Sequence, residues 1–332
     1  MFTAESAKEF LGSDFKKYRQ TLTLAIHSDE PYLEAINRYV LGRRGKEIRP
    51  VLSLLAGRCC GSLTPASYYC AAASEMLHTA TLMHDDVADA ASMRRGALSV
   101  AAMFSPAAAV LTGDFWLSRS LHLLTTHCSP AIIDCFAESV RRMSEGELLQ
   151  MDKADKLDTT EKDYYSIIYG KTAALFVSSV KSAAMAVEAE EKTTKALVDY
   201  AENLGLAFQI RDDIFDYSPD LKTGKSSGAD IKERKITLPL IGALANAPQK
   251  ASHIISRIGK IESVFAEKIS EAEKEIIAEV TAFTRENGGI EYAQQRLEEH
   301  IEKAKKALDT VPDSADKDML TGFAEYVGRR LT

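Results

Sequence analysis

The residues best suited to chemistry in this sequence are carboxylates spaced by one helical turn. Asp85 and Asp89 lie four residues apart in the run Met83-His84-Asp85-Asp86-Val87-Ala88-Asp89, and apolar residues at helical spacing predict a helix through it. Both carboxylates then lean over one face, with His78 two turns earlier on that face. Like charges at this spacing repel, so we expect a cation between them. Mg²⁺ suits such a site because it takes few protein ligands and fills its shell with water and phosphate oxygens.

The same spacing recurs in the run Phe208-Gln209-Ile210-Arg211-Asp212-Asp213-Ile214-Phe215-Asp216. Asp212 and Asp216 share a helix face, and Gln209 precedes Asp212 by three residues. These acids lie among apolar residues, where carboxylates are rare unless they are paired or bound to a metal. One such motif is typical of a solvated acidic patch. Two copies on apolar helices predict two walls of one metal-binding cleft.

With these motifs the sequence resembles the trans-isoprenyl diphosphate synthases, the family that makes farnesyl, geranylgeranyl and longer polyprenyl diphosphates. The resemblance spans roughly residues 40–240, and its segments come in the family's order. The segments are Gly45-Lys46-x-x-Arg49-Pro50, Glu75 to Gly96, Gly113-Asp114, Gly146-Glu147-x-x-Gln150, Lys171-Thr172, Phe208 to Asp216, Gly224-Lys225, Asp230 and Lys235. The resemblance implies an all-α fold: a single domain over residues 1–332, built as an isoprenoid-synthase-type helical bundle around a deep central cleft.

The resemblance also implies roles for single residues. The metal ligands are expected to be Asp85, Asp89, Asp212 and Asp216, holding three Mg²⁺ per active site when substrate is bound. The diphosphate of isopentenyl diphosphate is expected on Lys46, Arg49, His78 and Arg95. The diphosphate of the allylic substrate is expected on Arg94, Lys171, Gln209, Lys225 and Lys235. The residues expected to act in catalysis are Lys171, Thr172 and Gln209, of which the last two present oxygens to the developing carbocation.

Two segments near these residues have features of their own. Gly170 interrupts the apolar helix that carries Lys171, and we expect it to loosen or kink that helix and expose backbone carbonyls to the cation. Residues 217–235 are rich in glycine, serine and lysine and follow the second aspartate motif directly. We expect this segment to be a lid that closes over metal-bound diphosphate and excludes water.

The reaction that these groups favour is ionisation followed by condensation. No serine–histidine or cysteine–histidine pair stands out as a nucleophile in the sequence. Metal ions and lysines draw electrons onto the allylic diphosphate, which leaves. The double bond of isopentenyl diphosphate attacks the resulting cation, and loss of a proton completes the addition of one five-carbon unit. Excluding water matters because hydrolysis of the cation competes.

The length of the product is expected to depend on Ala80 and Thr81, which come just before Asp85 on the same helix. Both are small, and Ala80 lies about 7.5 Å from Asp85 along the helix axis. Family members whose product is farnesyl diphosphate share either a large aromatic residue at one of these positions or an insertion between the aspartates. The sequence has neither, which favours a long tunnel with its floor near Met76, Leu77 or Phe136. We therefore expect a product of roughly six or more isoprene units (C30 or longer), destined for a quinone side chain. The competing interpretation of Ala80 is a close helix-packing position.

The sequence favours this function over four others. A geranylgeranyl or farnesyl diphosphate synthase differs only in product length. A terpene cyclase ionises a diphosphate too, but needs no second diphosphate site and typically carries one such aspartate motif. A non-catalytic subunit of a heteromeric synthase typically loses these motifs, and both are intact here. A calcium-binding helical protein is disfavoured because the sequence has no EF-hand loop spacing.

Helical periodicity dominates the chain, and breaks separate the helices that must position these residues. Breaks fall at Gly42-Gly45, Gly61-Pro65, Ser92-Gly96, Ser105-Pro106, Ser129-Pro130, Asp152-Thr160, Tyr217-Gly228, Ala247-Pro248, Asn287-Gly289 and Pro312-Ser314. Thr160 and Asp163 have the pattern of a helix N-cap with acidic support in the first turn. No alternating strand pattern stands out, so we expect about ten or more helices.

Composition sets the remaining expectations. The 332 residues carry a formal net charge of −7, which argues against nucleic-acid binding. Five cysteines without a C-x-x-C pair favour reduced thiols and a cytoplasmic location. Residues 1–20 do not have the pattern of a signal peptide, and no apolar run is long enough for a membrane span. The resemblance implies a homodimer, in which the second copy could cover the apolar residues between Leu98 and Leu124. We expect contact with a membrane only transiently, during product release.

Overall fold

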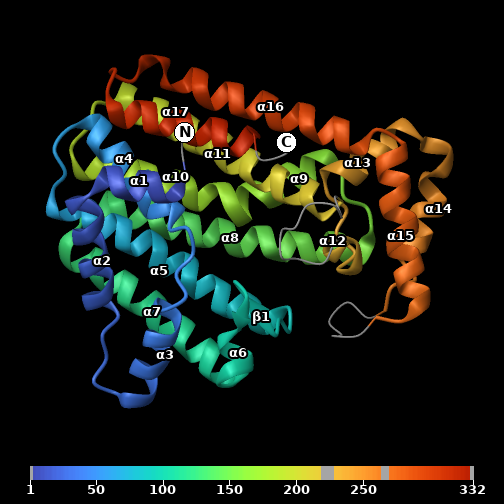
Figure 1. Cartoon of the computed structure of the whole chain (residues 1–332), viewed down its shortest axis with the longest axis horizontal. Helices are drawn as coiled ribbons and strands as arrows, with labels where there is room; N and C mark the ends of the chain where they lie inside the picture. The colour runs from blue at the N-terminus through green and yellow to red at the C-terminus, as the bar shows by residue number, and fades with distance from the viewer. Residues whose placement is uncertain (1–2, 218–227, 263–268, 330–332) are drawn as a thin grey trace. The chain divides into compact units, whose positions relative to one another are not determined.

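The computed structural model describes residues 3–217, 228–262 and 269–329, and it is almost entirely helical (Figure 1). The predicted all-α fold class is confirmed. The chain divides into two compact units. Unit 1 comprises Met1–Arg141, Leu175–Ala201 and Lys305–Tyr326, and unit 2 comprises Arg142–Ala174, Glu202–Ala304 and Val327–Thr332. The grouping of all 332 residues into a single domain stays a prediction.

Unit 1 is built largely from the N-terminal helices. In chain order these are α1(Ala4–Leu11), α2(Ser13–Ala25), α3(Pro31–Leu41), α4(Ile48–Cys60), α5(Pro65–Ala88), α6(Val100–Met103) and α7(Pro106–His127). The unit also includes most of α10(Ala174–Ala186), the 3₁₀-helix η2(Leu308–Thr310) and most of α17(Ala315–Arg329). The helices α8(Pro130–Lys156) and α11(Glu191–Asp216) contribute residues to both units.

Helix α5 is the central helix of unit 1. Thr64 caps its N-terminus in a capping box with Ser67, and Pro65 occupies the first turn, where its missing N–H costs nothing. Its middle presents small buried residues, including Ala71, Ala72 and Ala73, which let neighbouring helices approach closely. It packs against α2, α4 and α7, and Figure 1 shows α5 and α7 running side by side. This packing holds the helix end that bears Asp85.

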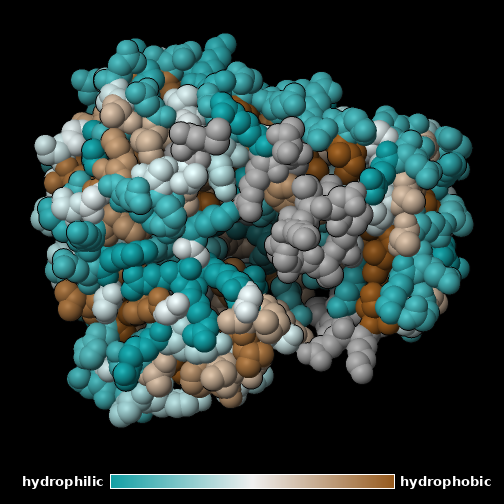
Figure 2. Space-filling view, viewed as in Figure 1, coloured by the Kyte–Doolittle hydropathy of each residue, from teal (hydrophilic) through white to brown (hydrophobic). Residues whose placement is uncertain are grey.

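A two-stranded antiparallel hairpin follows α5 directly. Its strands, β1(Met93–Arg94) and β2(Ala97–Leu98), pair Met93 with Leu98 and Arg94 with Ala97. The sequence predicts a break here but no strand, because strands of two residues are too short to show an alternating pattern. Three apolar side chains of the hairpin and of α6 are exposed, those of Met93, Leu98 and Met103. Figure 2 shows apolar surface over these two elements.

Unit 2 contains the remaining elements. They are α9(Glu161–Ile168), the π-helix η1(Tyr169–Ala173), α12(Ala229–Lys232), α13(Leu238–Asn246), α14(Pro248–Ile258), α15(Glu271–Glu286) and α16(Gly289–Ala307). The predicted cap at the start of α9 is confirmed, because Thr160 and Asp163 form a reciprocal capping box. The predicted break at Asp152-Thr160 begins later than expected, since α8 continues to Lys156.

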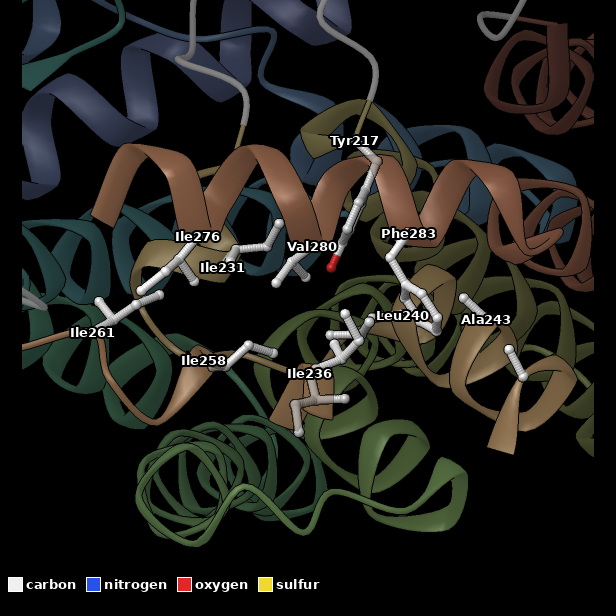
Figure 3. Packing of buried hydrophobic residues seen from close by; sticks show 12 residues of the cluster. Tyr217, Ile231, Ile236, Leu240, Ala243, Ile258, Ile261, Ile276, Val280 and Phe283 are labelled. Carbon is white, nitrogen blue, oxygen red and sulfur yellow. The ribbon is translucent and has the colours of Figure 1, made fainter. Parts of the chain in front are cut away.

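A hydrophobic cluster formed mainly by α12 to α15 supports the end of α11. Tyr217, the residue after Asp216, is fully buried in this cluster and receives a 3.3 Å hydrogen bond from Thr237 Oγ1. Figure 3 shows the Tyr217 ring directed among Ile231, Val280 and their neighbours. The last turn of α11 is therefore fixed by the core directly behind it.

None of the helices in the described ranges is long and apolar enough to cross a bilayer.

Candidate active site

The first aspartate motif lies where α5 ends. Ala88 is the last helical residue and Asp89 is the C-cap, whose backbone N–H donates a 2.8 Å hydrogen bond to the Asp85 carbonyl. Asp89 therefore stands one turn above Asp85, as the spacing predicted. Asp85 is half-buried and Asp89 is exposed. The C-terminal end of a helix carries partial negative charge, so the helix itself adds to the attraction that these two carboxylates exert on a cation.

The middle aspartate of this motif has a different environment. Asp86 is only 3% exposed, and its Oδ1 accepts hydrogen bonds from Arg94 Nε at 2.7 Å and Arg94 Nη2 at 2.5 Å. Burial raises the pKa of Asp86, although the Arg94 charge opposes this shift. Arg94 was predicted to bind the allylic diphosphate, and in the structure its guanidinium joins the hairpin to α5. That predicted contact with a diphosphate stays a prediction.

Helix α7 supports the same end of α5 through a glycine. A Cβ atom at Gly113 would lie 2.3 Å from His84 Nε2, so any larger residue there would have to push the His84 ring aside. The next residue, Asp114, places its Oδ1 3.3 Å from the same His84 nitrogen. Gly113 and Asp114 therefore both lie against the side chain that directly precedes Asp85 in the sequence.

Four charged or titratable side chains gather between α4, α5 and the hairpin, and we refer to them as the α4–α5 charge cluster: Arg49, Glu75, His78 and Arg95. Burial lowers the pKa of His78 well below its usual value, and the charges of Arg49 and Arg95 lower it further. His78 is therefore neutral at pH 7 and contributes a hydrogen-bonding nitrogen. Burial also lowers the pKa of Arg49, to about 10, which leaves its guanidinium charged at pH 7.

The loop before α4 approaches this cluster directly. A Cβ atom at Gly45 would lie 2.6 Å from Arg95 Cζ, and Arg95 Nη1 donates a 3.2 Å hydrogen bond to the Arg43 carbonyl. The structure thus brings together three of the four residues predicted to hold isopentenyl diphosphate. The fourth, Lys46, is exposed, and its ammonium lies 6.0 Å from the centre of the Tyr326 ring.

The second aspartate motif likewise lies where its helix ends, since Asp216 is the last residue of α11. The Asp212 side chain is 39% exposed and lies 3.3 Å from Arg211 Nη2. Both oxygens of Asp216 accept backbone N–H groups of α12, from Ala229 at 3.0 Å and Asp230 at 2.9 Å. Each oxygen of a carboxylate has two lone pairs, so these bonds orient Asp216 and leave it capacity for a metal ion.

The lid predicted over this motif is described only in part. Lys225 and Lys222 lie outside the described residues. Lys235 is described: its ammonium pairs with Glu233, and its backbone N–H donates a 2.8 Å hydrogen bond to the Asp230 carbonyl. The placement of Lys225 and Lys235 over an allylic diphosphate stays a prediction.

A chain of hydrogen bonds runs through the middle aspartate of this motif. Thr172 Oγ1 donates to Gln209 Oε1 at 2.7 Å, and Gln209 Nε2 donates to Asp213 Oδ1 at 2.9 Å. The other oxygen of Asp213 accepts the Tyr164 hydroxyl at 2.7 Å. Burial, followed by the negative charge of Asp230, raises the pKa of Asp213 to about 8. The chain fixes the direction of the Gln209 amide and joins the side chains of Thr172 and Gln209.

The predicted irregularity at Gly170 is a π-helical turn, η1. A Cβ atom at Gly170 would lie 2.5 Å from the Arg142 carbonyl oxygen and 3.1 Å from Gly146 Cα, so η1 presses directly on the backbone of α8. Helix α8 also meets the predicted catalytic lysine, because Lys171 Nζ lies 2.6 Å from Glu147 Oε1. Gln150 Nε2 donates a 3.2 Å hydrogen bond to Glu147 Oε2.

No role was predicted from the sequence for four residues that lie beside predicted site residues of their own unit: Glu75 in unit 1, and Glu147, Tyr164 and Asp213 in unit 2. Glu147 was visible as part of Gly146-Glu147-x-x-Gln150, and Asp213 as the middle of its motif. Tyr164 had no signal, because its partner is 49 residues away.

The two residues predicted to set product length both lie on α5. Ala80 is 2% exposed, and Thr81 is partly buried with its hydroxyl donating a 3.0 Å hydrogen bond to the His78 carbonyl. The side chains proposed as the tunnel floor, Met76, Leu77 and Phe136, are all buried. Ala80 thus lies in the interior of unit 1, an environment that both interpretations of this residue require.

The predicted site residues divide between the two units, with Asp85 and Asp89 in unit 1 and Asp212 and Asp216 in unit 2. Within the described part of the chain, no three or more histidine, cysteine or acidic side chains form a group able to hold a metal ion. Mg²⁺ commonly binds one or two carboxylates and completes its shell with water and phosphate, so pairs of aspartates still fit this ion.

Comparison with known proteins adds an independent finding. The model of the polyprenyl synthetase family matches residues 30–276. The chain is 35% identical over 328 residues to the octaprenyl diphosphate synthase of Haemophilus influenzae, a match covering 98% of this chain and 96% of that protein. A decaprenyl diphosphate synthase from Rhodobacter capsulatus has a similar structure, with a TM-score of 0.91, 32% identity, and coverage of 99% of this chain and 100% of that one.

A second solved structure is that of a polyprenyl synthase from Caulobacter crescentus, complexed with calcium and isoprenyl diphosphate. It matches with a TM-score of 0.88 and 30% identity, covering 99% of this chain and 98% of that one.

Proposed function

We propose that this chain, which belongs to the polyprenyl synthetase family of prenyltransferases, is a long-chain all-trans-polyprenyl diphosphate synthase. It condenses isopentenyl diphosphate head-to-tail with an allylic diphosphate. The observation that carries the proposal is the placement of both aspartate pairs at the C-terminal ends of buried helices, α5 and α11. In each motif the middle aspartate is buried and hydrogen-bonded.

The donor set suits Mg²⁺. Asp85, Asp89, Asp212 and Asp216 supply carboxylate oxygens, the ligands that this ion prefers, and the helix ends add negative potential. We propose that each active site holds three Mg²⁺ ions when substrate is bound, with these carboxylates and the substrate diphosphate as ligands. Bound there, Mg²⁺ would neutralise charge on the allylic diphosphate and make it a better leaving group. The calcium held by the Caulobacter crescentus relative supports a site for a divalent cation.

Three residues of the α4–α5 charge cluster, Arg49, His78 and Arg95, bind the other substrate, isopentenyl diphosphate. Arg49 and Arg95 bind the diphosphate of isopentenyl diphosphate with charged, forked donors. His78 adds a neutral donor, because its lowered pKa keeps it uncharged at pH 7. Lys46 lies at the exposed side of the same loop and supplies a further cation.

On the allylic side, Lys171 exchanges its bond with Glu147 for the diphosphate and stabilises the leaving group. The oxygens of Thr172 and Gln209 stabilise positive charge as the allylic cation develops. The hydrogen-bond chain to Asp213 and Tyr164 holds both oxygens in place before substrate arrives. Arg94, Lys225 and Lys235 bind the same diphosphate, and the segment 217–235 closes over it.

The long-chain product rests on two supports. One is the small size of Ala80 and Thr81, which leaves no bulky side chain before Asp85. The other is the set of similar proteins, which includes an octaprenyl and a decaprenyl diphosphate synthase. The product then supplies the side chain of a quinone.

We further propose a homodimer. Exposed apolar side chains between Leu98 and Leu121, among them Met103 and Leu111, offer a surface that a second copy covers. Light scattering at micromolar concentration should give the mass of a dimer, and a monomeric mass would contradict this. The five cysteines are free thiols, which supports a reducing, cytoplasmic location.

The proposed function is tested by measuring the chain lengths of the products, which form a ladder on chromatography. Purified protein, Mg²⁺, labelled isopentenyl diphosphate and an allylic primer should give products of roughly six or more isoprene units, separated by chromatography. Asp85→Ala, Asp89→Ala and Asp212→Ala should each nearly abolish turnover while the helical circular-dichroism spectrum stays unchanged. Near-normal rates in any two of them at saturating Mg²⁺ would refute the metal site. A ladder ending at C15 or C20 would favour the short-chain alternative.

A further inference from the structure

Glu47 has an unusual environment for a glutamate. It is the N-cap of α4, its side chain is fully buried, and its backbone is left-handed with φ 53° and ψ 43°. Left-handed backbone costs free energy in a residue with a side chain, and an isolated buried carboxylate costs more. A residue with both penalties persists only where its surroundings compensate for them.

The compensation comes from the two N-terminal helices. Tyr18 on α2 donates a hydrogen bond to Glu47 Oε1 at 3.1 Å, and Arg19 Nη2 donates to Oε2 at 2.5 Å. Lys8 on α1 adds a third partner, with its ammonium 3.6 Å from Oε2. Charge-assisted bonds of this kind are about twice as strong as neutral ones. The carboxylate thus ties α1 and α2 to the loop that precedes α4.

That loop carries the residues assigned to isopentenyl diphosphate. Lys46 directly precedes Glu47, and Arg49 is two residues further on, at the start of α4. The left-handed turn at Glu47 sets the direction in which the chain enters α4. The position of Glu47 therefore determines where both cations stand relative to the rest of the α4–α5 charge cluster.

We infer that Glu47 is a positioning residue for isopentenyl diphosphate: its two hydrogen bonds to α2 and its ion pair with α1 fix residues 45–49, so that Lys46 and Arg49 hold the diphosphate in one geometry. This inference rests on the proposed function. It adds that helices α1 and α2, which supply none of the predicted ligands, control affinity for one of the two substrates. The allylic side has no part in this mechanism.

The test is Glu47→Gln, which keeps the size of the side chain and removes its charge. We expect KM for isopentenyl diphosphate to rise about tenfold, with kcat at saturation within about twofold of wild type. KM for the allylic diphosphate should not change. Arg19→Met should reproduce the effect in part, and Arg19→Lys, which restores the charge, should recover most of the affinity.

The chain offers a matched control in Glu5, which is exposed and lies 2.9 Å from the same Lys8. Glu5→Gln breaks that surface ion pair without touching the loop, and should leave both KM values unchanged. Thermal melts of all variants show whether Glu47→Gln merely loosens the fold, in which case both KM values rise together.

The outcomes separate this inference from the proposed function. If wild type makes polyprenyl products and Glu47→Gln leaves KM for isopentenyl diphosphate unchanged, or raises both KM values equally, the positioning role is wrong. If wild type makes no condensation product with any allylic primer, the proposed function is wrong. Calorimetric titration with isopentenyl diphosphate alone then still measures whether Glu47→Gln weakens binding, and equal affinities would overturn the inference.

Discussion

The Tyr164 hydroxyl on α9 donates a 2.7 Å hydrogen bond to Asp213 on α11, and so joins two helices that both lead into the proposed allylic side. Both residues are buried. The bond leaves Asp213 directed at Gln209, whose amide it orients. A residue that never contacts substrate thus sets the geometry of one that is proposed to do so.

Tyr164→Phe should therefore affect stability and turnover together. Removing the hydroxyl leaves a buried carboxyl oxygen without its donor, which should lower the free energy of unfolding by about 1–3 kcal/mol. We expect kcat to fall while KM for isopentenyl diphosphate stays near wild type. Denaturant melts and steady-state kinetics measure both. Tyr292→Phe is the matched control, because it removes a 2.8 Å hydrogen bond to Glu161 outside the proposed site. Equal behaviour of the two variants would argue against the positioning role of Tyr164.

Gly170→Ala tests the contact between η1 and α8. The added Cβ would lie 2.5 Å from a backbone carbonyl oxygen, which cannot move as a side-chain end can. We expect a loss of about 1–3 kcal/mol of stability from this overpacking, with a large loss of turnover because Lys171 is the next residue. Gly328→Ala is the control, since a Cβ there would meet Ile301 at an ordinary 3.7 Å. Wild-type stability in Gly170→Ala would show that α8 and η1 can separate freely.

Glu75 gives a prediction for pH. Burial raises the pKa of Glu75 from 4.5 to about 7, although the charges of Arg95 and Arg49 oppose the shift. The folded state therefore holds this proton more tightly than the unfolded state. Stability should fall as pH rises between about 4.5 and 7, by at most about 3 kcal/mol from this group.

The measurement compares wild type with Glu75→Gln at pH 5 and pH 7.5. The variant carries no titrating group at this position, so its stability should fall less over that interval than the stability of wild type. Glu298→Gln, at an exposed position on α16, should behave as wild type. If wild type and Glu75→Gln lose the same stability over the interval, Glu75 does not titrate there.

Ala80→Phe addresses product length. The ring adds bulk about 7.5 Å from Asp85 along α5, so it should stop elongation early and shorten the product to roughly three or four isoprene units. Turnover should persist, because the metal ligands and both diphosphate sites are untouched. Ala66→Phe adds the same ring near the other end of α5 and should leave the ladder as it is in wild type. Identical ladders from wild type and Ala80→Phe would mean that Ala80 serves helix packing alone.

Much of the fold could be predicted from local sequence. Helix starts such as Thr160 depend on residues three positions apart, and helix breaks depend on glycine and proline within a few residues of each other. The aspartate motifs were visible for the same reason, because four residues make one turn. Features of this kind need no knowledge of what packs against the helix.

The parts that could not be predicted depend on partners distant in the chain. The role of Glu47 depends on Tyr18 and Arg19, which come 29 and 28 residues earlier. Arg94 could be assigned to a diphosphate from its motif, whereas its bond to Asp86 requires the hairpin to fold back on α5. Gly170 could be predicted to disturb its helix, but its contact with Gly146 depends on how α8 and η1 pack.

The π-helical turn η1 also bears on how this chain tolerates insertions and deletions. Near the start of η1, Gly170 packs against Gly146. At the end of η1, the Ala173 Cα atom lies 2.7 Å from where a Cβ on Gly205 would stand. A π-turn holds one residue more than the α-helical turn it replaces. Deleting one residue from 169–173 would replace η1 by a regular α-helical turn, in which the remaining residues of 169–173 point in different directions. Lys171 and the two glycine contacts could not then all keep their places. A deletion within 169–173 should therefore be as damaging as a substitution of Gly170.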